Sequence, residues 1–140
     1  MCQHLTPLAR SNDFRHIARC EHGTIHLTWD LMTVYLDDDT FTGLVQVLEK
    51  GASLTKPGKV HHESCHVFHR ELGYYQVWVR NIALNLSPAD FLIFTDLAQV
   101  ALAELPTVKR QLSTPAAVND PNPLLQGTVK ASNNPRFSLN

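Results

Sequence analysis

Alternating apolar and polar residues along the chain predict a set of short β-strands. Four segments show this alternation most regularly: 24-TIHLTWD-30, 32-MTVYL-36, 74-YYQVWVR-80 and 82-IALNL-86. The pattern is typical of strands that bury one face. The joints at Asp30-Leu31 and Arg80-Asn81 are short enough for hairpin turns. Upstream, 14-FRHIARC-20 and 66-HVFHREL-72 alternate less regularly, and we expect each to be a further strand that turns at Gly23 or Gly73.

Two helices are expected after the strands, because apolar residues then recur at helical spacing. In 87-SPAD-90, Ser87 suits the helix cap and Pro88 suits the first helical position. The segment 37-DDDT-40 has the same role in the first half, where the acidic run also complements the positive end of a helix. Gly51 is expected to end the first helix, and Pro106 the second.

The two halves of the chain repeat this order at a shift of fifty residues. Aligned positions with the same physical character are Gly23 with Gly73, Ile25-Leu27-Trp29 with Tyr75-Val77-Val79, Met32-Val34-Leu36 with Ile82-Leu84-Leu86, and Phe41 with Phe91. Identities are few, but the pattern of apolar positions is shared, and this pattern determines the fold prediction.

The predicted fold is therefore α+β, with two ββα units, or βββα units, that form one antiparallel sheet with both helices on one face. A single domain is expected over residues 1–112, built from halves at about 14–50 and 64–105. Residues 113–140 hold many Pro, Asn, Ser and Thr and show no periodicity. They predict a flexible tail or a docking arm.

Composition limits the classes of function. The formal net charge is -1, which argues against a general nucleic-acid binder, because such proteins need a dense positive field. No uninterrupted run of about eighteen apolar residues predicts a membrane span, and the first residues lack the apolar segment of a signal peptide. The expected location is the cytoplasm, where the three cysteines would remain thiols or metal ligands.

An open sheet would leave edges and one face uncovered, which favours a homodimer or a protein partner. Trp78 and Tyr35 alternate out of the predicted core and would lie on that second face. In the tail, Phe137 is the aromatic residue that could dock on a partner. The alternative is that these are scattered exposed aromatics, which are common on protein surfaces.

Histidine and cysteine are concentrated in two segments. In 61-HHESCHVFHR-70, four of the eight histidines and one of the three cysteines lie within ten residues. The second segment is 16-HIARCEHGTIH-26. If an approximate twofold axis relates the halves, the segments could approach each other and supply N and S ligands of the kind that zinc prefers. The candidate ligands are Cys20, His22, Cys65 and His69, followed by His26 and His66.

Other interpretations of these residues stay open, because no metal-binding motif of fixed spacing is present. The histidines could be solvated residues on exposed strand faces, with Cys65 as a small buried apolar residue. Two facing histidines could hold a haem, and a histidine cluster could make association depend on pH. A Cys65–histidine nucleophile would make the protein an enzyme. We favour a small non-catalytic binding or regulatory protein with a zinc-type site, and the alternative is a cofactor-free interaction or assembly module.

Overall fold

The computed structural model describes residues 2–118. The chain divides into two compact units, residues 1–104 and 105–140. The first unit holds every described strand, the helix α1 (Asp38–Ala52) and the beginning of the helix α2 (Pro88–Val118). Residues Leu105–Val118 continue α2 in the second unit.

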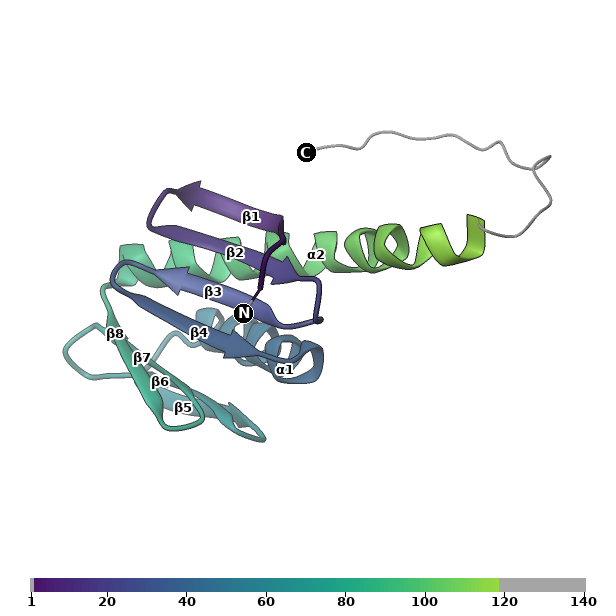
Figure 1. Ribbon diagram of the computed structural model, residues 1–140. Coiled ribbons are helices and arrows are strands. Elements are labelled where there is room, and N and C mark those ends of the chain that lie inside the picture. Colours follow the sequence, from purple (N-terminus) through teal and green to yellow (C-terminus); the bar gives the residue numbers. More distant parts are fainter. Residues whose placement is uncertain (1, 119–140) are drawn as a thin grey trace. The chain divides into compact units, whose positions relative to one another are not determined.

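Each half of the first unit contains a four-stranded antiparallel sheet whose strands follow chain order (Figure 1). The first sheet consists of β1 (Leu5–Asn12), β2 (Arg15–Cys20), β3 (Ile25–Trp29) and β4 (Met32–Leu36), and α1 follows it. The second sheet consists of β5 (Gly58–His62), β6 (Cys65–His69), β7 (Tyr75–Val79) and β8 (Ile82–Leu86), and α2 follows it.

The repeat at a shift of fifty is confirmed in the register of the strands. Ile25 pairs with Leu36 in the first sheet, and Tyr75 pairs with Leu86 in the second. The turns agree as well, since Asp30 and Arg80 both have positive φ, at 58° and 56°. A two-residue hairpin turn of the primed type requires that conformation at its first position. The same backbone is thus built twice from largely different residues.

The expected helix starts are confirmed. The Asp37 carboxylate accepts a hydrogen bond from the Thr40 N–H at 2.7 Å, and the Ser87 hydroxyl accepts one from the Asp90 N–H at 3.1 Å. Each cap satisfies an N–H that the first helical turn leaves without a partner. Both caps therefore fix where a helix leaves the last strand of its sheet.

The α+β class and the order of strands followed by a helix are confirmed, but the number of sheets and strands differs from the prediction. The prediction of a single sheet was wrong, because the strands of the two halves do not pair with each other and form two sheets of four strands. The strands β1 and β5 were not expected. These strands lack clear alternation: β1 has register shifts after Pro7 and Arg10, and every residue of β5 stays at least partly exposed.

The expected ends of the helices also change. The helix α1 continues through Gly51 to Ala52. The helix α2 continues through Pro106 to Val118, so residues 113–118 of the predicted arm are helical. The rest of that arm, with Phe137, lies outside the described residues.

Each helix contacts the sheet of the other half. Helix α1 packs against β5 and β6 of the second sheet, and Cys65 Sγ lies 3.9 Å from the Thr40 carbonyl oxygen at the start of α1. In return, Phe94 of α2 packs edge-on against Trp29 of β3, with ring centroids 5.0 Å apart. Phe91 of α2 also stacks on Tyr75 of β7 in its own half, with ring centroids 3.9 Å apart. The helices therefore contact sheets of both halves, and the two halves share one core.

The contact of α1 with β6 leaves no space for a side chain at Gly51. A Cβ built there would lie 2.5 Å from Val67 Cγ1 and 3.4 Å from Phe91 Cζ. We expect Gly51→Ala to lower the free energy of unfolding by about 1–3 kcal/mol, because overpacking a core forces its neighbours to move. Urea unfolding measures this change. Gly58→Ala is the matched control, since the nearest atom to its Cβ would be 3.8 Å away, and an equal loss in both variants would contradict the packing argument.

The segment Pro88–Val108 of α2 is long and apolar enough to cross a membrane by length and composition, with a mean hydropathy of 1.4. Of an apolar stretch of 18 residues within this segment, 44% is buried within the protein. Phe91, Phe94, Ala98 and Ala101 are each 1% exposed or less. Many of its apolar side chains thus belong to the core. Core helices commonly have the length and hydropathy of a membrane span.

Candidate metal centre

The described residues contain one group of His, Cys, Asp and Glu side chains that could hold a metal ion. Its members are Cys2, Cys20, Glu21 and His22, and their ligand atoms all lie within 4.8 Å of one another. Cys2 Sγ lies 3.6 Å from His22 Nδ1, and Cys20 Sγ lies 3.9 Å from the same nitrogen. Two thiols and an imidazole therefore converge on one point at the end of the first sheet.

Strand pairing brings these distant residues together. The antiparallel pairing of β1 with β2 places Leu5 opposite Cys20, so the residues that precede β1 lie beside the turn that follows β2. That turn is closed by hydrogen bonds from Cys20 N–H to the Thr24 carbonyl and from Gly23 N–H to the Cys20 carbonyl. Gly23 has φ of 85°, a conformation that side chains rarely adopt. The site is thus held by backbone geometry.

Glu21 acts as a clamp for the N-terminal segment. Its carboxylate accepts hydrogen bonds from the backbone N–H groups of Gln3, at 3.0 Å, and His4, at 3.2 Å. The bond from Gln3, together with those from Glu21's own N–H and from His4, lowers the pKa of the Glu21 carboxyl to about 2. Because both carboxylate oxygens already accept these bonds, Glu21 fits the role of positioning Cys2 better than that of a metal ligand.

The thiol of Cys20 is set up to ionise. Burial opposes its ionisation, but hydrogen bonds from Cys2, from the backbone of Thr24 and from His26 outweigh burial and lower its pKa to about 5. The pKa of the Cys2 thiol is raised, chiefly by its hydrogen bond to Cys20. One thiolate is therefore available at neutral pH, and the thiolate is the form that binds metals.

His26 completes a possible set of four ligands. Its Nε2 lies 3.5 Å from Cys2 Sγ, and its ring packs edge-on against Tyr35, with centroids 4.8 Å apart. For a tetrahedral zinc ion with Zn–S near 2.3 Å and Zn–N near 2.0 Å, neighbouring sulfur and nitrogen ligands lie about 3.5 Å apart. The distances from Cys2 Sγ to His22, 3.6 Å, and to His26, 3.5 Å, agree with that geometry, and the distance from Cys20 Sγ to His22 is longer, at 3.9 Å. His26 lies next to Cys2, outside the group of four residues whose ligand atoms are all within 4.8 Å of one another.

The structure brings together three of the six predicted ligands and places the other three on the second sheet. Cys20, His22 and His26 lie at the site. Cys65 is 1% exposed at the start of β6, and burial raises the pKa of its thiol. His66 is stacked with Phe68 and lies tilted beside His61, and His69 stacks on Tyr75. None of these three belongs to the group of Cys2, Cys20, Glu21 and His22.

The burial of Cys65 also bears on the enzyme hypothesis. A nucleophilic cysteine needs a lowered pKa and access to a substrate, whereas this thiol is buried and its pKa is raised. Its sulfur lies 3.9 Å from the carbonyl oxygen of Thr40, and His62 of β5 is its partner in the strand register. The second half of the repeat therefore uses its cysteine for packing.

Cys2 is the candidate ligand that sequence reasoning missed. The signal was the strand β1, because a strand paired with 14-FRHIARC-20 would have placed the N-terminal residues beside Cys20. That strand contains Pro7 and two register shifts, so its alternation is broken. Without it, Cys2 is a single residue far from every other ligand in the sequence.

Removing the clamp should weaken metal binding without removing a ligand. We expect Glu21→Ala to weaken zinc binding about 10-fold, in the range typical of groups that orient ligands, because Cys2 loses its fixed position. Competition with a chromophoric zinc chelator measures the affinity. Glu71→Ala is the matched control, since Glu71 is the equivalent exposed turn residue of the second sheet. Equal affinities in the wild type and Glu21→Ala would count against the clamp.

The residues predicted to bind a partner are partly described. Tyr35 is 59% exposed on the outer face of the first sheet, and Trp78 is half-buried on that of the second. Phe137 lies outside the described residues. The homodimer, the protein partner and the cytoplasmic location remain predictions.

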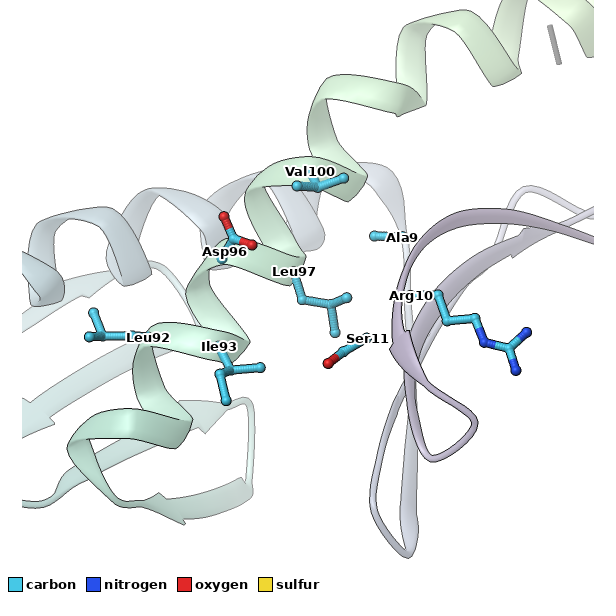
Figure 2. A pocket seen from close by; sticks show the side chains of 8 residues that line it. All are labelled: Ala9, Arg10, Ser11, Leu92, Ile93, Asp96, Leu97 and Val100. Atoms are coloured by element: carbon cyan, nitrogen blue, oxygen red, sulfur yellow. The ribbon is translucent and has the colours of Figure 1, made fainter. Parts of the chain in front are cut away.

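A separate groove of about 430 Å³ lies between β1 and α2. Figure 2 shows Ile93 and Leu97 pointing from α2 toward the strand, with Arg10 pointing away from the helix. Its lining is mostly apolar, from Ala9, Arg10, Ser11, Leu92, Ile93, Asp96, Leu97 and Val100. Its polar lining residues are Arg10, Ser11 and Asp96, which do not form a cluster of metal ligands.

Comparisons with protein-family models, with curated proteins and with solved structures found no match.

Proposed function

We propose that this is a small metal-binding protein that holds one zinc-type ion through Cys2, Cys20, His22 and His26. The observation that supports it is the convergence of two thiols and an imidazole whose ligand atoms lie within 4.8 Å of one another. A mixed set of two sulfurs and two nitrogens in tetrahedral arrangement is the donor set that structural zinc prefers.

The proposed role is structural or regulatory binding, without catalysis. Four protein ligands close the coordination sphere of zinc and leave no position for a substrate or for an activated water. The ion would tie the N-terminal segment to the turn between β2 and β3. Metal binding would then stabilise the first sheet at the point where its outermost strand, β1, begins.

The test is metal analysis of the untagged protein purified under reducing conditions, followed by cobalt substitution. We expect about one equivalent of zinc by elemental mass spectrometry, as one closed four-ligand site requires. Cobalt in the same site should show the intense visible bands of a tetrahedral ion and the near-ultraviolet charge-transfer band of a thiolate. A protein that takes up neither ion after dialysis with zinc or cobalt would overturn the proposal.

A further inference from the structure

The outer face of the second sheet carries a shallow groove with a different chemistry. It has a volume of about 280 Å³ and runs across β5, β6 and β7. Its lining residues are Lys59, His66, Phe68, Arg70, Gln76, Trp78 and Arg80. The strand register explains why they share one face, since Lys59 pairs with Phe68 and His66 pairs with Trp78. Cations and aromatic rings are thereby set side by side.

The groove is positive although the chain as a whole is not. Lys59, Arg70 and Arg80 are permanent cations at neutral pH, and no carboxylate lines the groove. Arg80 has an acidic neighbour outside the groove, because its Nη2 lies 3.7 Å from Asp37 Oδ2. The net charge of -1 therefore conceals a local cluster of positive charge on this face.

The aromatic and cationic side chains are held in place by one amide. Gln76 Oε1 accepts hydrogen bonds from Arg70 Nη2, at 2.7 Å, and from Trp78 Nε1, at 3.0 Å. The Arg70 guanidinium also lies over the Phe68 ring, 4.4 Å from its centroid. Trp78 and Phe68 are only partly buried. Part of each ring is thus exposed in a fixed orientation beside a fixed positive charge.

The repeat shows that the fold does not require these residues. The positions fifty residues earlier hold Ala18 for Phe68, Cys20 for Arg70, His26 for Gln76 and Thr28 for Trp78. The same backbone framework carries candidate metal ligands on the first sheet and aromatic and cationic side chains on the second. The second set therefore calls for a functional explanation of its own.

We propose that this face of the second sheet binds single-stranded nucleic acid. Single strands are bound by a positive groove that follows the phosphates and by aromatic side chains on which bases stack, and both components lie here within one groove. The expectation of no nucleic-acid partner followed from the net charge, which describes the whole surface and not a single face. The proposal does not depend on the metal site.

The test is fluorescence anisotropy of the full chain with a labelled oligothymidylate of about 20 nucleotides at low salt, a length that covers the usual site size of one binding face. We expect Trp78→Ala to weaken binding about 10-fold or more, because a stacked base is lost, and Trp78→Phe to retain most of the affinity. Lys59→Gln should reduce the salt dependence by about 0.7 in the logarithmic slope, the share of one phosphate contact on a single strand.

Lys50→Gln is the matched control, because Lys50 is an exposed lysine in the last turn of α1 and makes the same change in net charge. Circular dichroism of each variant verifies that it is folded. The proposal is overturned if the wild type does not bind the oligonucleotide. It is also overturned if Lys50→Gln reduces the salt dependence as much as Lys59→Gln, or if polyglutamate binds as tightly as the oligonucleotide.

Discussion

Cys20→Ser is expected to abolish stoichiometric zinc binding. Cys20 is fully buried between the other ligands, and its pKa of about 5 makes it the thiolate of the site at neutral pH. A serine hydroxyl does not ionise in this range and is a poor zinc ligand. Loss of a group that only orients a ligand costs about 10- to 100-fold in affinity, so loss of the ligand itself should cost at least about 100-fold.

The same variant should lose the stabilisation that zinc provides. An ion at 100 times its dissociation constant raises the free energy of unfolding by about 2.7 kcal/mol when it binds only the folded state. The melting temperature of the wild type should therefore rise on addition of zinc, and that of Cys20→Ser should not. Comparing each variant with and without zinc separates this effect from the cost of a buried hydroxyl.

Cys65→Ser is the matched control for both measurements. It makes the same chemical change at the other buried cysteine, which lies outside the group of Cys2, Cys20, Glu21 and His22. It should retain one equivalent of zinc and the zinc-dependent rise in melting temperature. The assignment fails if Cys20→Ser binds zinc with the affinity of the wild type, or if Cys65→Ser loses it equally.

The sequence predicted the repeat well because each strand that buries a face shows it in alternation. The segments around Leu27, Val34, Val77 and Leu86 were correct for this reason, as were the helix caps at Asp37 and Ser87. Alternation shows that a face is buried but not which element covers it. The contacts of each helix with the sheet of the other half therefore required the structure.

The metal site could be predicted only in part for a related reason. Cys20, His22 and His26 lie within one hairpin, so their proximity followed from the sequence. Cys2 joins them through the pairing of β1 with β2, and the register shifts in β1 hide that strand from a periodicity argument. Alternation sends the histidines near Cys65 to two faces of one sheet, so the candidate ligands of that segment stay predictions.

Phe94→Ala is expected to destabilise both halves of the first unit together. Phe94 belongs to the second half, is 1% exposed and packs edge-on against Trp29 of the first half. Removing a buried phenylalanine side chain typically costs about 3–5 kcal/mol, because apolar contacts are lost and a cavity remains. Such a loss is a large fraction of the free energy of unfolding of an ordinary domain, about 5–15 kcal/mol.

Urea unfolding followed by tryptophan fluorescence and by circular dichroism tests this expectation. Trp29 and Trp78 report on the two sheets, so an interlocked core should unfold in one transition by both methods. Leu92→Ala is the matched control, because Leu92 lies on the same helix but is 61% exposed, and its cost should stay near 0.5 kcal/mol. Two separate transitions, or a Phe94→Ala variant as stable as Leu92→Ala, would show that the halves fold independently. That outcome would contradict the shared core, which is built from the contacts of each helix with the sheet of the other half.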